Sequence, residues 1–136
     1  MRIDPNGLIA MKGQRYPITE AGIEKLAEKL IERGLRDRKL VKDCEVSFLR
    51  NAKIRDRVCT VLQVKHAKPL PQLDFHVAQI FIDDELGVPI RYAAYNFPKA
   101  AGQKPELIEE YTYLNLKLNV GLTNKDFDPK NPEYKF

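Results

Sequence analysis

The hydrophobic period changes once along this 136-residue chain, and that change constrains the fold more than any other feature. Before residue 35 the apolar residues recur with the period of an α-helix, and after residue 40 they alternate with the period of a β-strand. The helical stripe consists of Ile23, Leu26, Ala27, Leu30 and Ile31. One amphipathic helix followed by consecutive strands buries both apolar sides when the helix packs on an antiparallel sheet.

The predicted helix begins at Thr19 and ends before Gly34. Thr19 is a suitable N-cap, and Ile18 and Ile23 have the spacing of a hydrophobic staple across that cap. Gly34 is the residue type that commonly follows the last turn of a helix. The stripe is expected to pack on the core, with charged residues on the remaining surface of the helix.

Five strands are predicted after the helix, over Leu40–Leu49, Arg57–His66, Asp74–Ile82, Pro89–Phe97 and Glu109–Val120. The first two form a hairpin whose tip, from Arg50 to Asp56, is basic. The fold class is therefore α+β: a curved antiparallel sheet of about five strands, with one N-terminal helix packed on a face. We expect a single domain over residues 1–136, no closure into a barrel, and a C-terminal tail docked through Phe127, Tyr134 and Phe136.

Charge and composition exclude several classes of protein. Residues 33–68 carry eleven basic and four acidic side chains, whereas residues 106–136 carry four and six. We interpret the basic region as a solvated face rather than a nucleic-acid site, because no motif of a nucleic-acid-binding fold accompanies it. No apolar run approaches the roughly 20 residues of a membrane span, and no signal peptide is recognisable. Cys44 and Cys59 are either two buried thiols or one disulfide.

No residue pattern predicts catalysis, a cofactor or a metal site. His66 and His76 have no second ligand at metal spacing, and Ser47 lacks the glycines of a nucleophile elbow. The acidic run that begins at Asp83 is typical of a hairpin turn, and Asp126 lies in a segment without the features of a calcium loop. We therefore expect the chain not to be an enzyme.

Two groups of side chains are candidates for binding. The tyrosines Tyr92, Tyr95, Tyr111 and Tyr113, with Arg91, form either cross-strand aromatic pairs or the wall of a pocket for an apolar ligand. The second group is apolar strand surface that one helix about 10 Å wide leaves uncovered on a sheet about 20 Å across. Its members are Val58, Leu62, Val64, Leu114, Leu116, Leu118 and Val120.

Three stretches carry a resemblance to a known family. They are RYPITEAGIEKLAEKLIERG, FHVAQIFIDDELGVPIRYAAY and EEYTYLNLKLNVGLTNKDFDPKNPEYKF. Together they resemble an uncharacterised bacterial family, domain-of-unknown-function family 1571, over nearly the whole chain. The hairpin IFIDDELGVPIRY is also similar to one in the outer-membrane lipoprotein carrier superfamily, whose fold is a half-barrel with helices in its concavity.

The resemblance implies a function and a compartment. Family members are usually longer, with an export signal and extra strands, so the chain is expected to be periplasmic or associated with the cell envelope, and to match the C-terminal part of a longer domain. We expect a non-enzymatic module that holds a lipid, a lipoprotein or another apolar ligand in the sheet concavity. The alternative is a structural or interaction domain that binds a protein through a sheet edge or the basic hairpin. An oxidising compartment would favour a Cys44–Cys59 disulfide, although strand alternation then requires a bulge.

Overall fold

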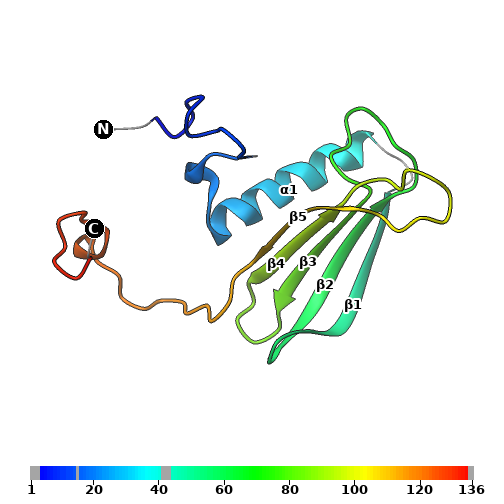
Figure 1. The fold of residues 1–136 in the computed structure, drawn as a ribbon. Coiled ribbons are helices and arrows are strands. Elements are labelled where there is room, and N and C mark those ends of the chain that lie inside the picture. The colour runs from blue at the N-terminus through cyan, green and yellow to red at the C-terminus, as the bar shows by residue number, and fades with distance from the viewer. Residues whose placement is uncertain (1–3, 15, 41–43, 135–136) are drawn as a thin grey trace.

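The computed structural model describes residues 4–14, 16–40 and 44–134 of the chain. A short 3₁₀ helix, η1 (Ile18–Glu20), precedes the α-helix α1 (Ile23–Leu40). Five strands follow, β1 (Cys44–Ile54), β2 (Arg57–His66), β3 (Val77–Asp83), β4 (Pro89–Tyr95) and β5 (Leu107–Thr112), and then a second 3₁₀ helix, η2 (Asn124–Phe127). Figure 1 shows α1 lying across one side of the sheet, which confirms the predicted α+β class.

The strands form one open sheet in the order β1-β2-β3-β4-β5, and every neighbouring pair is antiparallel. The two edge strands, β1 and β5, are not paired with each other, so the sheet is not closed into a barrel. Register places Phe48 opposite Leu62 and Leu62 opposite Ile80, which puts these three side chains on one face. Because Leu26 and Leu30 of α1 pack on the same cluster, this is the side of the sheet that carries the helix.

The helix differs from its predicted bounds at both ends. Gly22 has a φ of 113°, which interrupts the chain after η1, so the α-helix begins at Ile23 and the Gly22 carbonyl accepts the first helical bond from Leu26. Thr19 is therefore not the N-cap, and Ile18 is 77% exposed rather than part of a staple. The helix also runs through Gly34 to Leu40.

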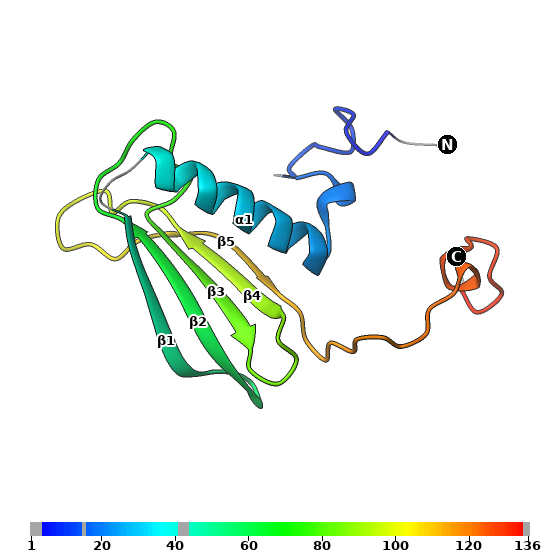
Figure 2. The same ribbon diagram turned by 180° about the vertical axis from the view of Figure 1, so that it is seen from behind.

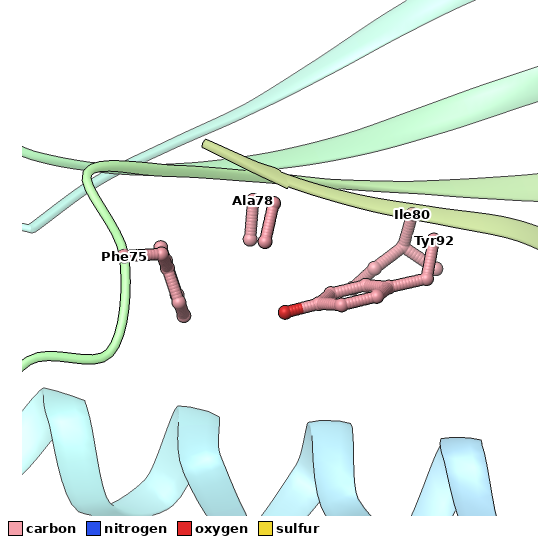
Figure 3. Close-up of a cluster of buried hydrophobic side chains, with 5 residues drawn as sticks. Phe75, Ala78, Ile80 and Tyr92 are labelled. Carbon is pink, nitrogen blue, oxygen red and sulfur yellow. The ribbon is translucent and has the colours of Figure 1, made fainter. Parts of the chain in front are cut away.

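The core consists of two clusters on opposite faces of the sheet. Beneath α1 lie Phe75, Ala78, Ile80, Tyr92 and Ala94, with Leu26 and Leu30 packed against them; Figure 3 shows four of the buried members pointing toward the helix. The second cluster contains Ile54, Cys59 and Ile90, and Leu116 packs against it from beyond β5. The predicted helical stripe is thus confirmed for Leu26 and Leu30, whereas Ile31 is 65% exposed.

The first hairpin is longer than predicted. β1 continues to Ile54, and the register shifts between Leu49 and Ala52, where Asn51 has a φ of 62°. The bulge lets the strand continue through the stretch predicted as a connection. β2 has its predicted bounds, Arg57–His66.

The last strand is shorter than predicted, and the tail does not dock. β5 ends at Thr112, after which Tyr113 donates one bond to the Ile90 carbonyl; next to Ile90 is Pro89, which has no N–H to offer. Residues 113–123, here called the arm, extend away from the sheet in both views (Figures 1 and 2). Beyond the arm, η2 and the residues up to 134 form a separate compact loop, here called the C-terminal loop, in which Phe127 is 71% exposed. Phe136 lies outside the described residues.

Candidate functional site

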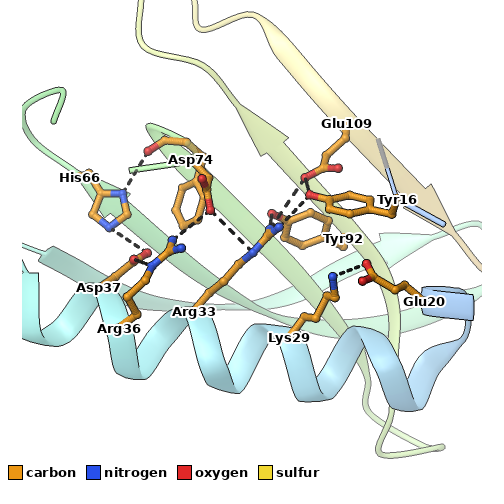
Figure 4. A network of polar contacts seen from close by, with 11 residues as sticks. Tyr16, Glu20, Lys29, Arg33, Arg36, Asp37, His66, Asp74, Tyr92 and Glu109 are labelled. Atoms are coloured by element: carbon orange, nitrogen blue, oxygen red, sulfur yellow. Dashed lines mark hydrogen bonds and ion pairs between the residues drawn. The ribbon is translucent and has the colours of Figure 1, made fainter. Parts of the chain in front are cut away.

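A network of polar contacts joins α1 to the sheet over β4 and β5 (Figure 4). Arg33 is its centre: it donates to the Tyr16 hydroxyl at 2.7 Å and to the Tyr92 hydroxyl at 3.3 Å, and its guanidinium lies 4.0 Å from Glu109. Tyr16 in turn donates to Glu109 at 3.4 Å. We call Arg33 and these three partners the clasp, because they connect the helix, the N-terminal segment and two strands.

A second set of contacts continues the network toward the end of α1. Arg36 bonds Asp74 at 2.9 Å and Asp37 at 3.1 Å, and Asp37 is 2% exposed. The fully buried His66 has Nδ1 at 3.0 Å from the Phe75 carbonyl. A carbonyl only accepts, so Nδ1 carries a proton, and the other nitrogen, Nε2, lies 3.6 Å from an Asp37 carboxylate oxygen.

The clasp favours a fixed charge on Arg33 and a neutral Tyr92. Burial opposes the charge on Arg33, but its bond to Tyr16 and the neighbouring Tyr92 and Asp74 outweigh burial and raise the pKa of Arg33. Burial first, and then the nearby Glu109 carboxylate, raise the pKa of Tyr92. A charged arginine that contacts two hydroxyl groups and a carboxylate holds the helix in place over β4 and β5.

Away from the clasp, the α1-facing side of the sheet is uncovered over the first hairpin. Val46, Phe48 and Val58 are 55%, 66% and 42% exposed, and strand register puts them on the same face as Leu62 and Val64, which are only partly buried. We call these five residues the open face. In Figures 1 and 2 the tip of the β1–β2 hairpin extends beyond the span of α1.

Two pockets lie at the margins of the sheet. One, of about 240 Å³, is enclosed by η1, the start of α1 and the side chains of Tyr16, Leu26, Tyr111 and Tyr113. The ion pair between Lys29 and Glu20 forms part of its rim. Its lining of aromatic and aliphatic groups with few charges is typical of a small apolar site.

The other pocket, of about 310 Å³, lies at the turn end of the sheet, between Ile90 and Lys117. Its wall includes the ion pair of Arg57 with the buried Asp83, whose contacts measure 2.5 and 2.6 Å. The bonds from Arg57 and from the Leu86 and Glu85 amides outweigh burial and lower the pKa of Asp83 to about 2. Asp83 has therefore a structural role in the β3–β4 turn, as the sequence indicated.

The structure separates the predicted tyrosine cluster into two groups. Tyr92 pairs with Tyr111 on the α1-facing side, where Tyr92 is buried in the clasp and Tyr111 lines the smaller pocket with Tyr113. Arg91 and Tyr95 are an odd number of positions from Tyr92 along β4, so they lie on the opposite face. Of the two alternatives, one wall built from all five residues does not form, and cross-strand pairing holds for Tyr92 and Tyr111.

The predicted apolar strand surface is likewise divided. Val58, Leu62 and Val64 belong to the open face, as expected. The remaining four do not, because β5 ends before them: Leu116 packs on the second cluster, and Leu114, Leu118 and Val120 are exposed on the arm.

The two cysteines are free thiols, so the expected disulfide is a wrong prediction. Cys44 pairs with His66 at one end of the hairpin, and Cys59 pairs with Ala52 near the other end. Eight residues of extended strand between Cys44 and Ala52 span about 26 Å, whereas a disulfide needs Cα atoms within about 7 Å. Burial raises the pKa of both thiols, which disfavours the reactive thiolate.

Within the described ranges, no group of three or more histidine, cysteine, aspartate or glutamate side chains is arranged to hold a metal ion. Likewise, none of the helices described there has the length and apolar character needed to cross a membrane.

The sequence pattern does not predict the clasp. It predicts Arg33 on the solvated side of the helix, whereas the structure places this side chain between α1 and the sheet. The predicted structural role of His66 agrees with its buried position. A signal is nevertheless present, because Arg33 follows Leu30 by three residues and Asp37 follows Arg33 by four, which continues the apolar stripe with charged side chains.

A family model described as "Protein of unknown function (DUF1571)" matches residues 1–136. No curated protein and no solved structure matches the chain.

Proposed function

The chain belongs to the DUF1571 family of proteins of unknown function, and we propose that it is a non-enzymatic binding module whose open face holds the apolar part of a lipid-like ligand. The observation that carries the proposal is the exposure of Val46, Phe48 and Val58 beside the partly buried Leu62 and Val64. A continuous apolar surface of this kind marks a ligand, a partner or missing protein.

The arrangement of α1 supports the proposal. The clasp fixes one side of the helix over β4 and β5, so the helix does not shift across to cover the first hairpin. A Cβ at Gly34 of α1 would meet nothing within 4 Å, so the helix surface at this position is not in close contact with the rest of the described chain.

The cellular location and the absence of catalysis are parts of the same proposal. The periplasm or cell envelope is expected from the resemblance alone, and fractionation of cells that express the tagged chain tests it. The likeness to lipoprotein carriers remains an expectation from one hairpin. The absence of catalytic activity is also a proposal, supported by the structural roles of His66 and Asp83.

Binding of a neutral fluorescent apolar probe tests the proposed function, with fatty acids as competitors. Phe48→Ser is expected to weaken binding about tenfold, because burial of an aromatic side chain contributes roughly 1.5–3 kcal/mol and Phe48 is already one-third covered. The matched control is Leu49→Ser, a neighbour that is 47% exposed on the opposite face of the same strand. Equal loss in both variants, or no probe binding by the folded wild type at low protein concentration, would exclude the open face as the site.

A second function is favoured by the edge strand. β1 has one unpaired edge along its 11 residues, and such an edge is a template for strand addition by another protein. A proline placed in β1 at a position whose N–H points outward would abolish strand addition without affecting the apolar probe.

A further inference from the structure

We propose that the arm docks on the open face of a second copy of this chain, and that two copies exchange arms to form a closed dimer. This inference goes beyond ligand binding, and it starts from a different part of the molecule, the segment between β5 and η2. The ligand and the arm would compete for the same surface, so each of the two proposals needs its own test.

The arm is an apolar segment with no cover. Leu114, Leu118, Val120 and Leu122 are 45%, 40%, 54% and 62% exposed, and Lys117 is the only charged residue between 113 and 123. Across the residues described, no protein group bonds the backbone N–H groups of residues 114–122. The backbone of the arm bends, since Asn115, Asn119 and Gly121 have φ of 55°, 54° and 74°. A segment with exposed apolar side chains gains free energy when another surface covers it.

The arm and the open face belong to one chain but lie at opposite edges of its sheet. β5, from which the arm departs, and β1, which carries Val46 and Phe48, are separated by four strand spacings, or about 19 Å. Both views show the arm running away from β1 (Figures 1 and 2). To reach the open face of its own chain the arm would have to reverse its direction and cross the sheet, so the exchange is proposed between molecules.

Length and area favour the exchange of two arms over a single contact. The 11 residues of the arm span up to about 36 Å when extended, the same as the 11 residues of β1, so one arm reaches along the whole open face. A stable interface uses roughly 20–30 residues a side. One arm on one face is far below that size, whereas exchange doubles the contact, because each chain then gives an arm and receives one.

Charge favours one direction of docking. The segment after the arm, residues 124–134, carries three acidic and two basic side chains, and the tip of the first hairpin carries Arg50, Lys53 and Arg55 against Asp56. In the described part of the molecule, none of these three cations is in an ion pair. An arm that points toward the tip brings the opposite charges together.

Light scattering coupled to size-exclusion chromatography of the full chain tests the dimer. The expected mass is twice that of one chain at high concentration and falls toward the monomer on dilution. Val120→Asp on the arm and Phe48→Asp on the open face should each raise the dissociation constant at least about tenfold, because each buries an unpaired charge at both contacts. The matched control, Leu70→Asp, alters a residue that is 42% exposed outside both surfaces and should leave the mass unchanged.

Mixing the two variants separates docking from misfolding. An equimolar mixture contains one intact arm and one intact face, so it should form more dimer than either variant alone. A wild type that stays monomeric at every concentration, a dimer that survives both substitutions, or an open-ended polymer would each overturn the proposal.

Failure of the proposed function has a different signature. The Val120→Asp monomer has a free open face and should bind the neutral apolar probe at least as tightly as the wild type. If that monomer binds no probe while the wild type dimerises, the ligand proposal fails and the arm exchange stands. If the monomer binds the probe while the wild type never dimerises, the arm exchange fails and the ligand proposal stands.

Discussion

The α1-facing side of the sheet has two halves with similar strands and opposite degrees of cover. Over β4 and β5, Tyr92 is 3% exposed and the partly buried Arg33 fixes the helix above it; over β1 and β2, Phe48 is 66% exposed on the same side of the sheet. An aromatic residue on this sheet is therefore buried or exposed according to whether the helix lies over it, and the polar contacts of the helix fix where it lies. Burial of apolar side chains favours packing of the helix on the sheet, and the contacts of Arg33 fix its position over β4 and β5.

The clasped half should be the most sensitive part of the molecule. Arg33→Ala removes the cation that lies 4.0 Å from the largely buried Glu109, and loss of one partner from a buried pair costs about 3–5 kcal/mol of unfolding free energy. Urea denaturation followed by circular dichroism measures it. Arg38→Ala, an exposed change on the same helix, is the control and should cost less than about 0.5 kcal/mol. Equal effects of the two substitutions would mean that the clasp does not hold α1.

Truncation of an apolar side chain should cost more unfolding free energy in the half of the sheet beneath α1 than in the exposed half. Ile80→Ala removes a side chain that is 7% exposed beneath the helix, and should cost about 2–5 kcal/mol. Phe48→Ala should cost less than about 1 kcal/mol in the monomer, because most of the ring already contacts solvent. Parallel denaturant titrations at low protein concentration give both values. A large loss for Phe48→Ala would show that the open face is covered in solution.

The pair at the turn end lies on the face opposite α1, so it tests a contact outside both halves. Asp83→Asn should cost about 1–3 kcal/mol at neutral pH, because it weakens the acceptor for Arg57 and two turn amides. The pKa of Asp83 is lowered to about 2 from an ordinary 3.8, so the stability it supplies is present above pH 3.8 and is lost as the pH falls toward 2.

Acid titration of wild type and Asp83→Asn measures this loss. The two unfolding free energies should converge as the pH falls from 3.8 toward about 2. A constant difference across that window would contradict a stabilising Asp83 carboxylate.

The smallest effect on stability is expected from deletion of the C-terminal loop. Residues 124–134 fold on themselves, with the Asn131 amide bonded to the Lys125 carbonyl and the Tyr134 hydroxyl bonded to the Asp126 carbonyl. Deletion of residues 124–136 should therefore change the unfolding free energy of the monomer by less than about 0.5 kcal/mol. Differential scanning calorimetry measures the change. A clear drop in Tm would mean that the tail docks on the domain, as the sequence predicted.

The sequence by itself determined which segments are helix and strand. The period of 3.6 residues around Leu26 and Leu30, the period of two in β2, and the short turns after β1 and β3 each depend on neighbours along the chain. An antiparallel meander with one covering helix was therefore predictable.

The tertiary structure decided where those elements end and what they leave bare. α1 continues through Gly34, at a cost of about 1 kcal/mol, and its last turns place Arg36 beside Asp74 and Asp37 beside His66. β5 stops at Thr112 despite the alternation of Leu114 to Val120, because the neighbouring strand begins at Pro89 and offers no further ladder. Cys44 and Cys59 lie far apart because the register of the hairpin, with its bulge, sets their partners. Periodicity is a property of single segments, whereas partners, register and cover are properties of their assembly.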